Sequence, residues 1–179
     1  MTTLLTVCTG NICRSPAGAL LLEEYLGDIA SSVSAGAHAM VDHGIPSEML
    51  TELGADGIDG SRHRARQLDA HLMKSADLVL CMTRDHRTLA AQTDPASLRK
   101  VFTLMEVAET ARRGAKLEGS TPAERLSDVP LAVAAFRPEL AGADIPDVPD
   151  PYKRDLGAYH ESYAMIRAAV RDIAAWVRG

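Results

Sequence analysis

The residues from Cys8 to Ser15 join a short apolar run to a helical pattern, and this junction restricts the fold more than any other feature. Leu4–Val7 is a short, mainly apolar run that predicts a buried strand. Ser15 and Pro16 then open Ala17–Leu26, whose apolar residues recur at helical spacing. Proline is favoured in the first turn of a helix, where its missing N–H is not needed. The chain therefore begins as strand, loop and helix.

The same alternation continues along the chain. Further strands are expected at 32–35, 76–82 and 100–104, and helices at 46–53, 68–74, 84–92 and 158–177. Strands that alternate with helices predict an α/β fold with a parallel sheet. The crossover connections between such strands should be right-handed.

The stretch at about 105–149 departs from this rhythm, since it holds five prolines and three glycines. Two helical pieces are expected within it, near 106–113 and 121–135. We interpret it as an elaborated connection inside one domain that spans 1–179, because 179 residues is a normal length for a single core. It leads directly into Asp150, so we expect it to lie beside the mouth of the site.

Composition narrows the class of protein. The formal net charge is −5, which does not favour nucleic acid or an anionic membrane as a partner. No apolar stretch approaches the roughly 18 residues that span a bilayer, and Met1–Val7 lacks the features of a targeting segment. Three cysteines and scattered histidines suggest neither a disulfide framework nor a metal site. We expect a cytoplasmic enzyme without membrane insertion.

The loop itself has the chemistry of an oxyanion site. Cys8 and Arg14 are separated by five residues, between a strand and a helix. Backbone N–H groups of such a loop, and the positive end of the following helix, can surround a phosphate. The Arg14 guanidinium matches two phosphate oxygens, and the positive field favours a thiolate at Cys8. Gly10 and Asn11 tolerate the backbone angles of a tight anion-binding turn.

Several motifs resemble those of the low-molecular-weight protein tyrosine phosphatases. The loop with its flanks, Val7–Pro16, looks like the opening of that family. Further matches follow in family order and cover nearly the whole chain: Ser34–Gly36, His63–Gln67, Asp77–Met82 and Asp150–Tyr152. A bare cysteine-x5-arginine pattern is weak, whereas this combination is specific.

The resemblance implies a fold, a mechanism and a set of site residues. The fold would be a four-stranded parallel sheet flanked by helices. Cys8 would attack phosphorus to form a phosphocysteine, Arg14 would hold the phosphoryl oxygens, and Asp150 would act as acid and then base. No cofactor and no metal is implied. The phosphate-binding residues would be Thr9, Gly10, Asn11, Ile12, Cys13 and Ser15, with Met40 and Tyr152 on the pocket wall.

The expected substrate is phosphotyrosine in a protein, and a phosphorylated small molecule is the alternative. Met40 and Lys153 stand where the family often has larger or aromatic residues, so the pocket wall differs from the common pattern. Thioredoxin-coupled arsenate reductases share the loop but need two more cysteines past the third strand, where only Cys81 is found. A non-catalytic phosphate-binding module would usually lack Cys8 or Asp150.

Three further residues each allow a structural interpretation and a chemical one. Cys13 either packs under the loop or forms a protective disulfide with an oxidised Cys8. His63 is expected to brace the loop and not to act as a base. Asp147 competes with Asp150 for the role of general acid, but Asp150 is favoured because Pro151 stiffens the turn that follows it.

Overall fold

A four-stranded parallel sheet forms the centre of the protein. The computed structural model describes residues 1–179, and its strands lie in the order β2-β1-β3-β4. The strands are β1 Thr2–Cys8, β2 Ala30–Gly36, β3 Leu78–Cys81 and β4 Val101–Thr103. Most of their residues are buried, as expected for a parallel sheet covered on both faces. The predicted α/β class and the four-stranded parallel sheet are therefore confirmed.

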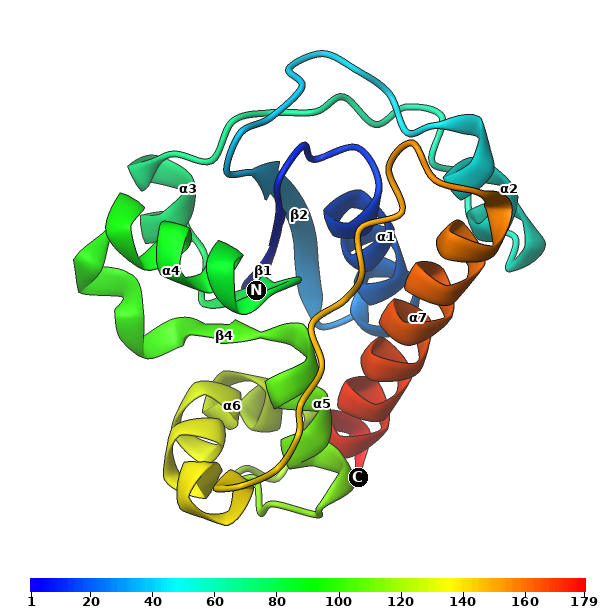
Figure 1. Ribbon diagram of the computed structural model, residues 1–179. Helices are drawn as coiled ribbons and strands as arrows, with labels where there is room; N and C mark the ends of the chain where they lie inside the picture. Colours follow the sequence, from blue (N-terminus) through cyan, green and yellow to red (C-terminus); the bar gives the residue numbers. More distant parts are fainter.

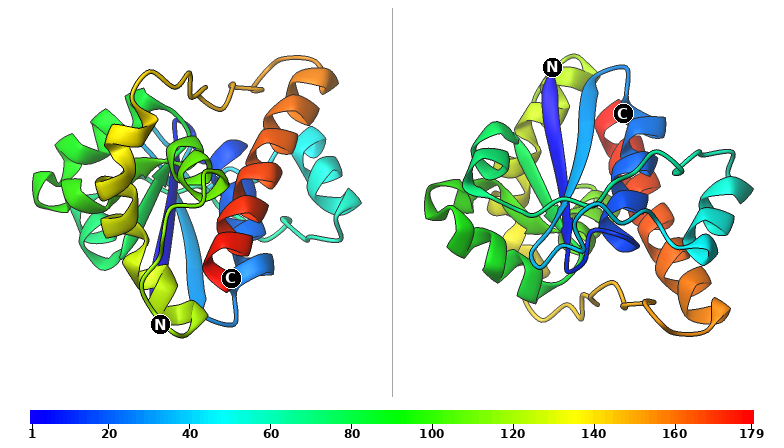
Figure 2. Two further views of the ribbon diagram at one scale, coloured as in Figure 1. Left: turned by 90° about the horizontal axis from the view of Figure 1, so that it is seen from below. Right: turned by 90° about the horizontal axis from the view of Figure 1, so that it is seen from above.

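Alternate residues of each strand feed two separate cores. Leu4, Leu80 and Phe102 belong to the larger core, while Leu5 and Val79 belong to the smaller one on the opposite face. The larger core is covered by four helices: α1 Arg14–Leu26, α5 Leu104–Arg112, α6 Pro122–Phe136 and α7 Leu156–Arg178. The smaller is covered by α3 Ala70–Ser75, α4 Arg84–Thr93 and the 3₁₀ helix η1 Pro95–Lys100. Figures 1 and 2 show helices on both sides of the sheet.

The long carboxy-terminal helix organises the larger core. Its apolar stripe, which includes Tyr163, Ile166, Val170 and Ile173, is buried. Asp155 caps its first turn by accepting a hydrogen bond from Ala158 N at 2.9 Å. The helix α2, Ser47–Ala55, lies beside the start of α7 and contributes buried residues to the same core (Figure 1). None of the helices combines the length and the apolar composition that spanning a bilayer requires.

The connection at 105–149 does not lie beside the site as a whole, contrary to expectation. Its helices α5 and α6 cover the face of the sheet and pack on α7, because their apolar residues complete the larger core. The helix α6 begins at a capping box formed by Thr121 and Glu124. After the short 3₁₀ helix η2, Arg137–Leu140, the chain runs across the molecule toward α7 (gold in Figure 1). Only the end of this run reaches the loop after β1.

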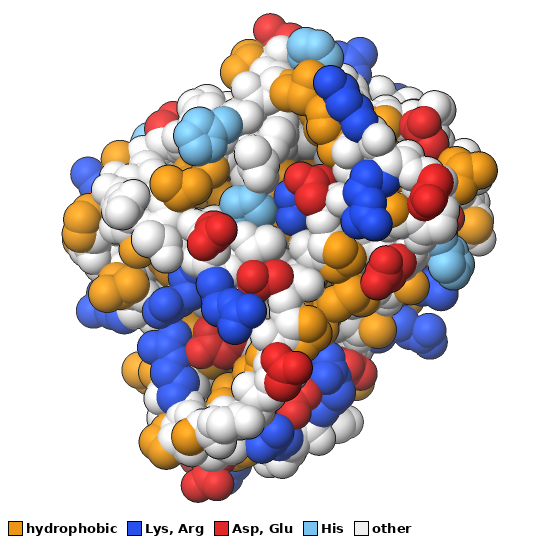
Figure 3. Space-filling model, viewed as in Figure 1, with side chains coloured by type: hydrophobic (Ala, Val, Ile, Leu, Met, Phe, Trp, Pro, Cys, Tyr) orange, Lys and Arg blue, Asp and Glu red, His pale blue; other side chains and the backbone are white.

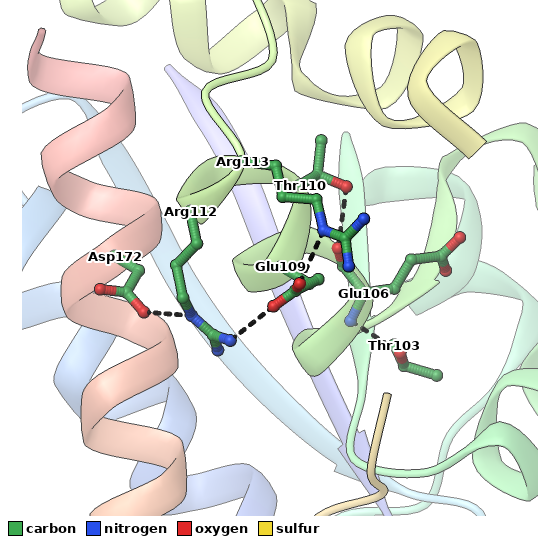
Figure 4. Close-up of polar contacts among 7 residues, drawn as sticks. All are labelled: Thr103, Glu106, Glu109, Thr110, Arg112, Arg113 and Asp172. Carbon is green, nitrogen blue, oxygen red and sulfur yellow. Dashed lines mark hydrogen bonds and ion pairs between the residues drawn. The ribbon is translucent and has the colours of Figure 1, made fainter. Parts of the chain in front are cut away.

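Ion pairs fix α5 against α7. Arg112 bridges Glu109 of its own helix and Asp172 of α7, both at 2.7 Å (Figure 4). Arg113 pairs with Glu109 at 2.8 Å. Arg112 and Arg113 are partly exposed, so each pair stabilises the fold by no more than about 1 kcal/mol. The pairs set the position of α5 on α7 more than they add to stability.

Candidate active site

In the loop after β1, the carbonyl groups of residues 8–11 are paired with neighbouring segments, whereas the N–H groups of residues 9–13 are not. The carbonyls of Cys8, Thr9 and Gly10 accept hydrogen bonds from the backbone of residues 37–40, each at 2.9 Å. The Asn11 carbonyl accepts from Nε2 of His63 at 2.6 Å. None of the N–H groups from Thr9 to Cys13 donates a hydrogen bond within the protein. A set of unpaired N–H groups at the start of a helix can bind an oxyanion.

Asn11 holds this loop in shape. It is fully buried and has a φ of 56°, in the left-handed region that asparagine tolerates. Its Nδ2 donates to the hydroxyls of Ser15 and Ser34, both at 2.9 Å. Its Oδ1 accepts from the backbone N–H of Arg66 at 2.9 Å. With His63 on its carbonyl, both the side chain and the carbonyl of Asn11 are tied to neighbouring segments, which holds the turn in its conformation.

Cys8 and Ser15 face each other across the loop. The Cys8 Sγ lies 2.9 Å from the Ser15 Oγ, and both residues are buried. Because Asn11 donates to the Ser15 oxygen, the hydroxyl proton is left for the sulfur or for the Ala35 carbonyl, which is farther at 3.3 Å. The Ser15 hydroxyl is therefore placed to donate to the Cys8 sulfur, and such a donor would stabilise a thiolate there.

Gly36 explains how the loop can lie so close to β2. A Cβ placed on Gly36 would lie 2.5 Å from the Thr9 carbonyl oxygen and 3.0 Å from Ala39. These are backbone and short side-chain atoms that cannot swing away. The glycine of the Ser34–Gly36 motif is thus required for the packing of the loop.

Arg14 reaches from the first turn of α1 to the segment before α7. It is only 4% exposed. Its Nη1 donates to the Val148 carbonyl at 3.0 Å, and its Nη2 lies 2.8 Å from Oδ2 of Asp150. The Asp150 side chain is 52% exposed, and its Oδ1 accepts from the Tyr152 N–H at 3.2 Å. The predicted nucleophile, arginine and acid are thus brought to one place from three parts of the chain.

These residues line a pocket of about 150 Å³ at the carboxyl end of β1. Parallel α/β sheets characteristically bind ligands beyond this edge. The structure places the predicted wall residues Met40 and Tyr152 in the lining, and adds His38, which sequence analysis did not select. The full lining consists of Cys8, Thr9, Gly10, Ile12, Cys13, Arg14, His38, Met40, Asp150 and Tyr152.

His86 is a second residue that the sequence analysis missed. Its Nε2 lies 2.8 Å from the Thr9 hydroxyl and its Nδ1 lies 2.9 Å from the Thr83 hydroxyl. Burial, and next the nearby Arg14 charge, lower the pKa of His86 to about 4. The imidazole is therefore neutral at physiological pH and orients Thr9. Thr83 follows the carboxyl end of β3 and caps α4, so a Thr-x-x-His pattern after a strand was the available signal.

Asp147 lies outside the pocket. Its Oδ1 accepts from the backbone N–H of Arg84 at 3.0 Å, at the start of α4. Its Oδ2 is 3.6 Å from the Arg84 side chain. This position suits an acceptor for the first turn of a helix, as expected for a residue that caps a turn.

The remaining cysteines differ in position. Cys13 lines the pocket, and burial, followed by the charges of Cys8 and Asp150, raises its pKa to about 12. It is therefore a neutral thiol. Cys81 is fully buried in the smaller core, and burial raises its pKa as well. The chain has three cysteines, Cys8 and Cys13 in the loop and Cys81 in the smaller core. The additional pair of cysteines that the arsenate reductases need is therefore absent.

Comparison with known proteins agrees with this geometry. The model of the family described as low molecular weight phosphotyrosine protein phosphatase matches residues 3–125. The probable low molecular weight protein-tyrosine-phosphatase EpsP of Ralstonia nicotianae is 30% identical over 175 residues, which cover 98% of this chain and 93% of EpsP.

Solved structures show the same fold. Vibrio vulnificus Wzb in complex with benzylphosphonate has a TM-score of 0.73 and 22% identity, covering 97% of both chains. The YwlE arginine phosphatase from Geobacillus stearothermophilus has a TM-score of 0.74 and 23% identity, covering 98% of this chain and 92% of its own. From the family match and the full-length relative together, the chain belongs to the low molecular weight phosphotyrosine protein phosphatase family, a class of cysteine-dependent hydrolases.

Proposed function

We propose that this protein hydrolyses phosphotyrosine in proteins, with Cys8 as nucleophile, Arg14 as phosphate ligand and Asp150 as acid and base. The observation that supports it most strongly is the convergence of these three side chains on one pocket, beside the unpaired N–H groups of the loop. Each group has a separate task in phosphoryl transfer. A module that only binds phosphate needs neither the sulfur nor the carboxylate.

In the first step the Cys8 thiolate attacks phosphorus, a P–S bond forms and the P–O bond to the tyrosine breaks. The loop N–H groups and Arg14 bind the equatorial oxygens, which carry the transferred charge. Arg14 must then exchange its contact with Asp150 for contacts with phosphate. Once separated from Arg14, the Asp150 carboxylate takes up a proton from the solvent or from the phosphate monoanion and transfers it to the leaving oxygen.

In the second step water attacks the phosphocysteine. The now ionised Asp150 takes a proton from the water, the new P–O bond forms and the P–S bond breaks. The electron pair returns to Cys8 as a thiolate, which the Ser15 hydroxyl stabilises from 2.9 Å. Inorganic phosphate leaves and the enzyme is regenerated without a cofactor.

The pocket wall supports an aryl substrate. Ile12, Met40 and Tyr152 present apolar surface beside the sulfur, and an aromatic ring can pack between such side chains. A phosphorylated small molecule with a ring would fit the same wall, so the two substrate classes are separated only by experiment. Since Cys8 must remain reduced to act, we propose that the enzyme works in the cytoplasm.

A side-by-side turnover assay tests the proposal. It compares phosphotyrosine peptides, phosphoserine peptides, phosphoarginine and a panel of phosphorylated metabolites. We expect kcat/KM for phosphotyrosine peptides to exceed that for phosphoserine peptides by at least about a hundredfold, since phenolate is the better leaving group. A higher kcat/KM for phosphoarginine or for a metabolite would overturn the assignment of protein phosphotyrosine as substrate.

A further inference from the structure

A second pocket opens next to the catalytic one and carries three arginines. It has a volume of about 410 Å³ and lies between α4, the carboxyl end of β4 and the run that follows α6. Arg84, Arg87 and Arg137 line it, together with the carboxylates of Glu106 and Asp147. Figure 3 shows Lys and Arg side chains gathered over this region, on the face that Figure 1 presents. The mechanism uses none of these arginines.

Arg87 and Arg137 are anchored through Nε, whereas Arg84 is largely exposed, and all three keep their two terminal nitrogens free of hydrogen bonds within the protein. The Arg87 Nε donates to the Val101 carbonyl at 2.9 Å. The Arg137 Nε donates to Glu106 at 2.8 Å, while its guanidinium lies 5.2 Å from the centre of the Phe102 ring. The Arg84 Nε lies 3.6 Å from Asp147. None of their Nη groups donates a hydrogen bond within the protein, unlike the Nη1 groups of Arg112 and Arg113.

The local charge contrasts with that of the whole chain. Three arginines and two carboxylates leave this pocket one positive charge, in a protein whose formal net charge is −5. Both carboxylates are already engaged, Glu106 by Arg137 and Asp147 by the Arg84 N–H. A guanidinium held at Nε presents a planar pair of donors that matches a carboxylate or a phosphate. The chemistry of the pocket therefore selects an anion.

The segment from Asp147 to Asp150 forms the wall between the two pockets. Asp147 lines the arginine pocket, and Asp150 lines the catalytic one. Val148 between them is fixed on both sides, since its N–H donates to the Met82 carbonyl and its carbonyl accepts from Arg14. Three residues of extended chain span about 10 Å. An extended substrate peptide covers the same distance in about three residues.

We propose that the pocket lined by Arg84, Arg87 and Arg137 binds an anionic side chain of the phosphoprotein substrate, about three residues from the phosphotyrosine. This inference rests on the proposed function, because it names the sequence around the residue that is dephosphorylated. The anion is the carboxylate of Asp or Glu, or the phosphate of a second phosphotyrosine. The pocket also has apolar lining residues, which would contact the carbon atoms of that side chain: Leu140, Ala141, Ala143 and Ile145.

The test measures kcat/KM for a set of phosphotyrosine peptides that place Glu, phosphotyrosine or Ala at each position up to four residues on either side. We expect a peptide with an anion near the third position, on one side, to exceed its alanine partner by about fivefold, and the ratio to fall as salt screens the charges. If kcat/KM at that position rises more with phosphotyrosine than with Glu, the anion that the pocket binds is phosphate. Equal values for anionic and alanine peptides at all positions would overturn the inference.

Matched variants place the effect in the pocket. Arg84→Gln removes a side chain that is 70% exposed but keeps the backbone N–H that Asp147 binds. We expect it to lower the anionic-to-alanine ratio about threefold, whereas Arg171→Gln, an equal charge change on exposed α7 surface, should leave the ratio unchanged. Arg137→Gln should repeat the loss. An equal fall in Arg171→Gln would show that only long-range charge is involved and would overturn the site. Failure of the wild type to hydrolyse any phosphotyrosine peptide would instead overturn the proposed function.

Discussion

The carboxylate of Asp150 lies 2.8 Å from Nη2 of Arg14, so the proposed acid and the proposed phosphate ligand bind each other. The two groups cannot keep this contact while Arg14 grips a phosphoryl group with both terminal nitrogens. In the proposed mechanism, substrate therefore separates them, and the freed carboxyl group faces the leaving oxygen. This exchange makes several properties of Asp150 measurable.

Asp150→Asn should lower kcat for phenyl phosphates by roughly 10²- to 10⁴-fold, because the amide cannot protonate the leaving oxygen. The loss should shrink for leaving groups of low pKa, which depart without a proton. Inorganic phosphate should bind the variant several-fold more tightly, since a competing carboxylate is gone from Arg14. Steady-state kinetics across a leaving-group series, with phosphate inhibition constants, would measure both effects.

Asp147→Asn is the matched control for this change. Its carboxylate contacts Arg84 at the start of α4 and lies outside the catalytic pocket. We expect a loss of stability of about 0.5–1 kcal/mol from the weakened contact with the helix start, and no change in leaving-group dependence. If Asp147→Asn instead reproduced the leaving-group signature, Asp147 would be the acid.

Cys8→Ser should abolish turnover while oxyanion binding and the fold survive. The serine hydroxyl has no base within reach, since Ser15 is itself a donor to this position. Thermal unfolding and phosphate binding would confirm that the site is intact. Hydrolysis of an aryl phosphate above roughly a hundredth of the wild-type rate would contradict a cysteine nucleophile.

Mild peroxide should inactivate the enzyme reversibly. Peroxide converts the Cys8 thiolate to a sulfenic acid, which then condenses with the Cys13 thiol to a disulfide and water. Cys13 does not react first, because burial raises its pKa to about 12 and keeps it protonated. A thiol reductant should restore the activity of the peroxide-treated wild type. The Cys13→Ala variant should be inactivated irreversibly by the same treatment. Mass spectrometry that found only sulfinic acid on wild-type Cys8 would rule out this protection.

His86 should make the fold less stable in acid. Burial and Arg14 lower its pKa to about 4, while Asp150, Asp85 and Asp147 act in the opposite direction. Between about pH 4 and its ordinary pKa near 6.5, the unfolded chain binds a proton that the folded chain does not. Its contribution is complete above this range and is lost as the pH falls through it. Urea unfolding from pH 4.5 to 7.5 should therefore show a weaker pH dependence in His86→Gln than in the wild type.

The sequence predicted the strands and helices well because their signals are local. Runs such as Leu4–Val7 are apolar on both faces, and the order of strands and helices left one plausible class of fold. The loop residues could be chosen for the same reason, since their chemistry is contiguous in the chain. The family resemblance pointed to Asp150, although it is far from Arg14 in the sequence.

What could not be predicted depends on contacts between distant segments. His86 contacts Thr9, 77 residues away. The Thr-x-x-His pattern after β3 marks His86 as a residue at the start of α4, but it does not say that the imidazole reaches Thr9. The helices of the 105–149 connection were expected beside the site, but burial of Leu126, Val129 and Val133 draws α6 onto the sheet. The connection precedes Asp150 directly in the sequence, but this did not show how close its helices lie to the site in the folded protein.

The wall formed by Asp147–Asp150 has a consequence for how such enzymes diversify. One side of it is fixed by Arg14, the proposed phosphate ligand, and the other borders a surface supplied by the elaborated connection. Insertions and substitutions between α5 and this wall can therefore change which proteins are recognised, while the catalytic side chains keep their positions. We expect sequence variation within the family to be greatest in that stretch. Chimeras in which the stretch is exchanged between two members should take on the substrate preference of the member that supplies it.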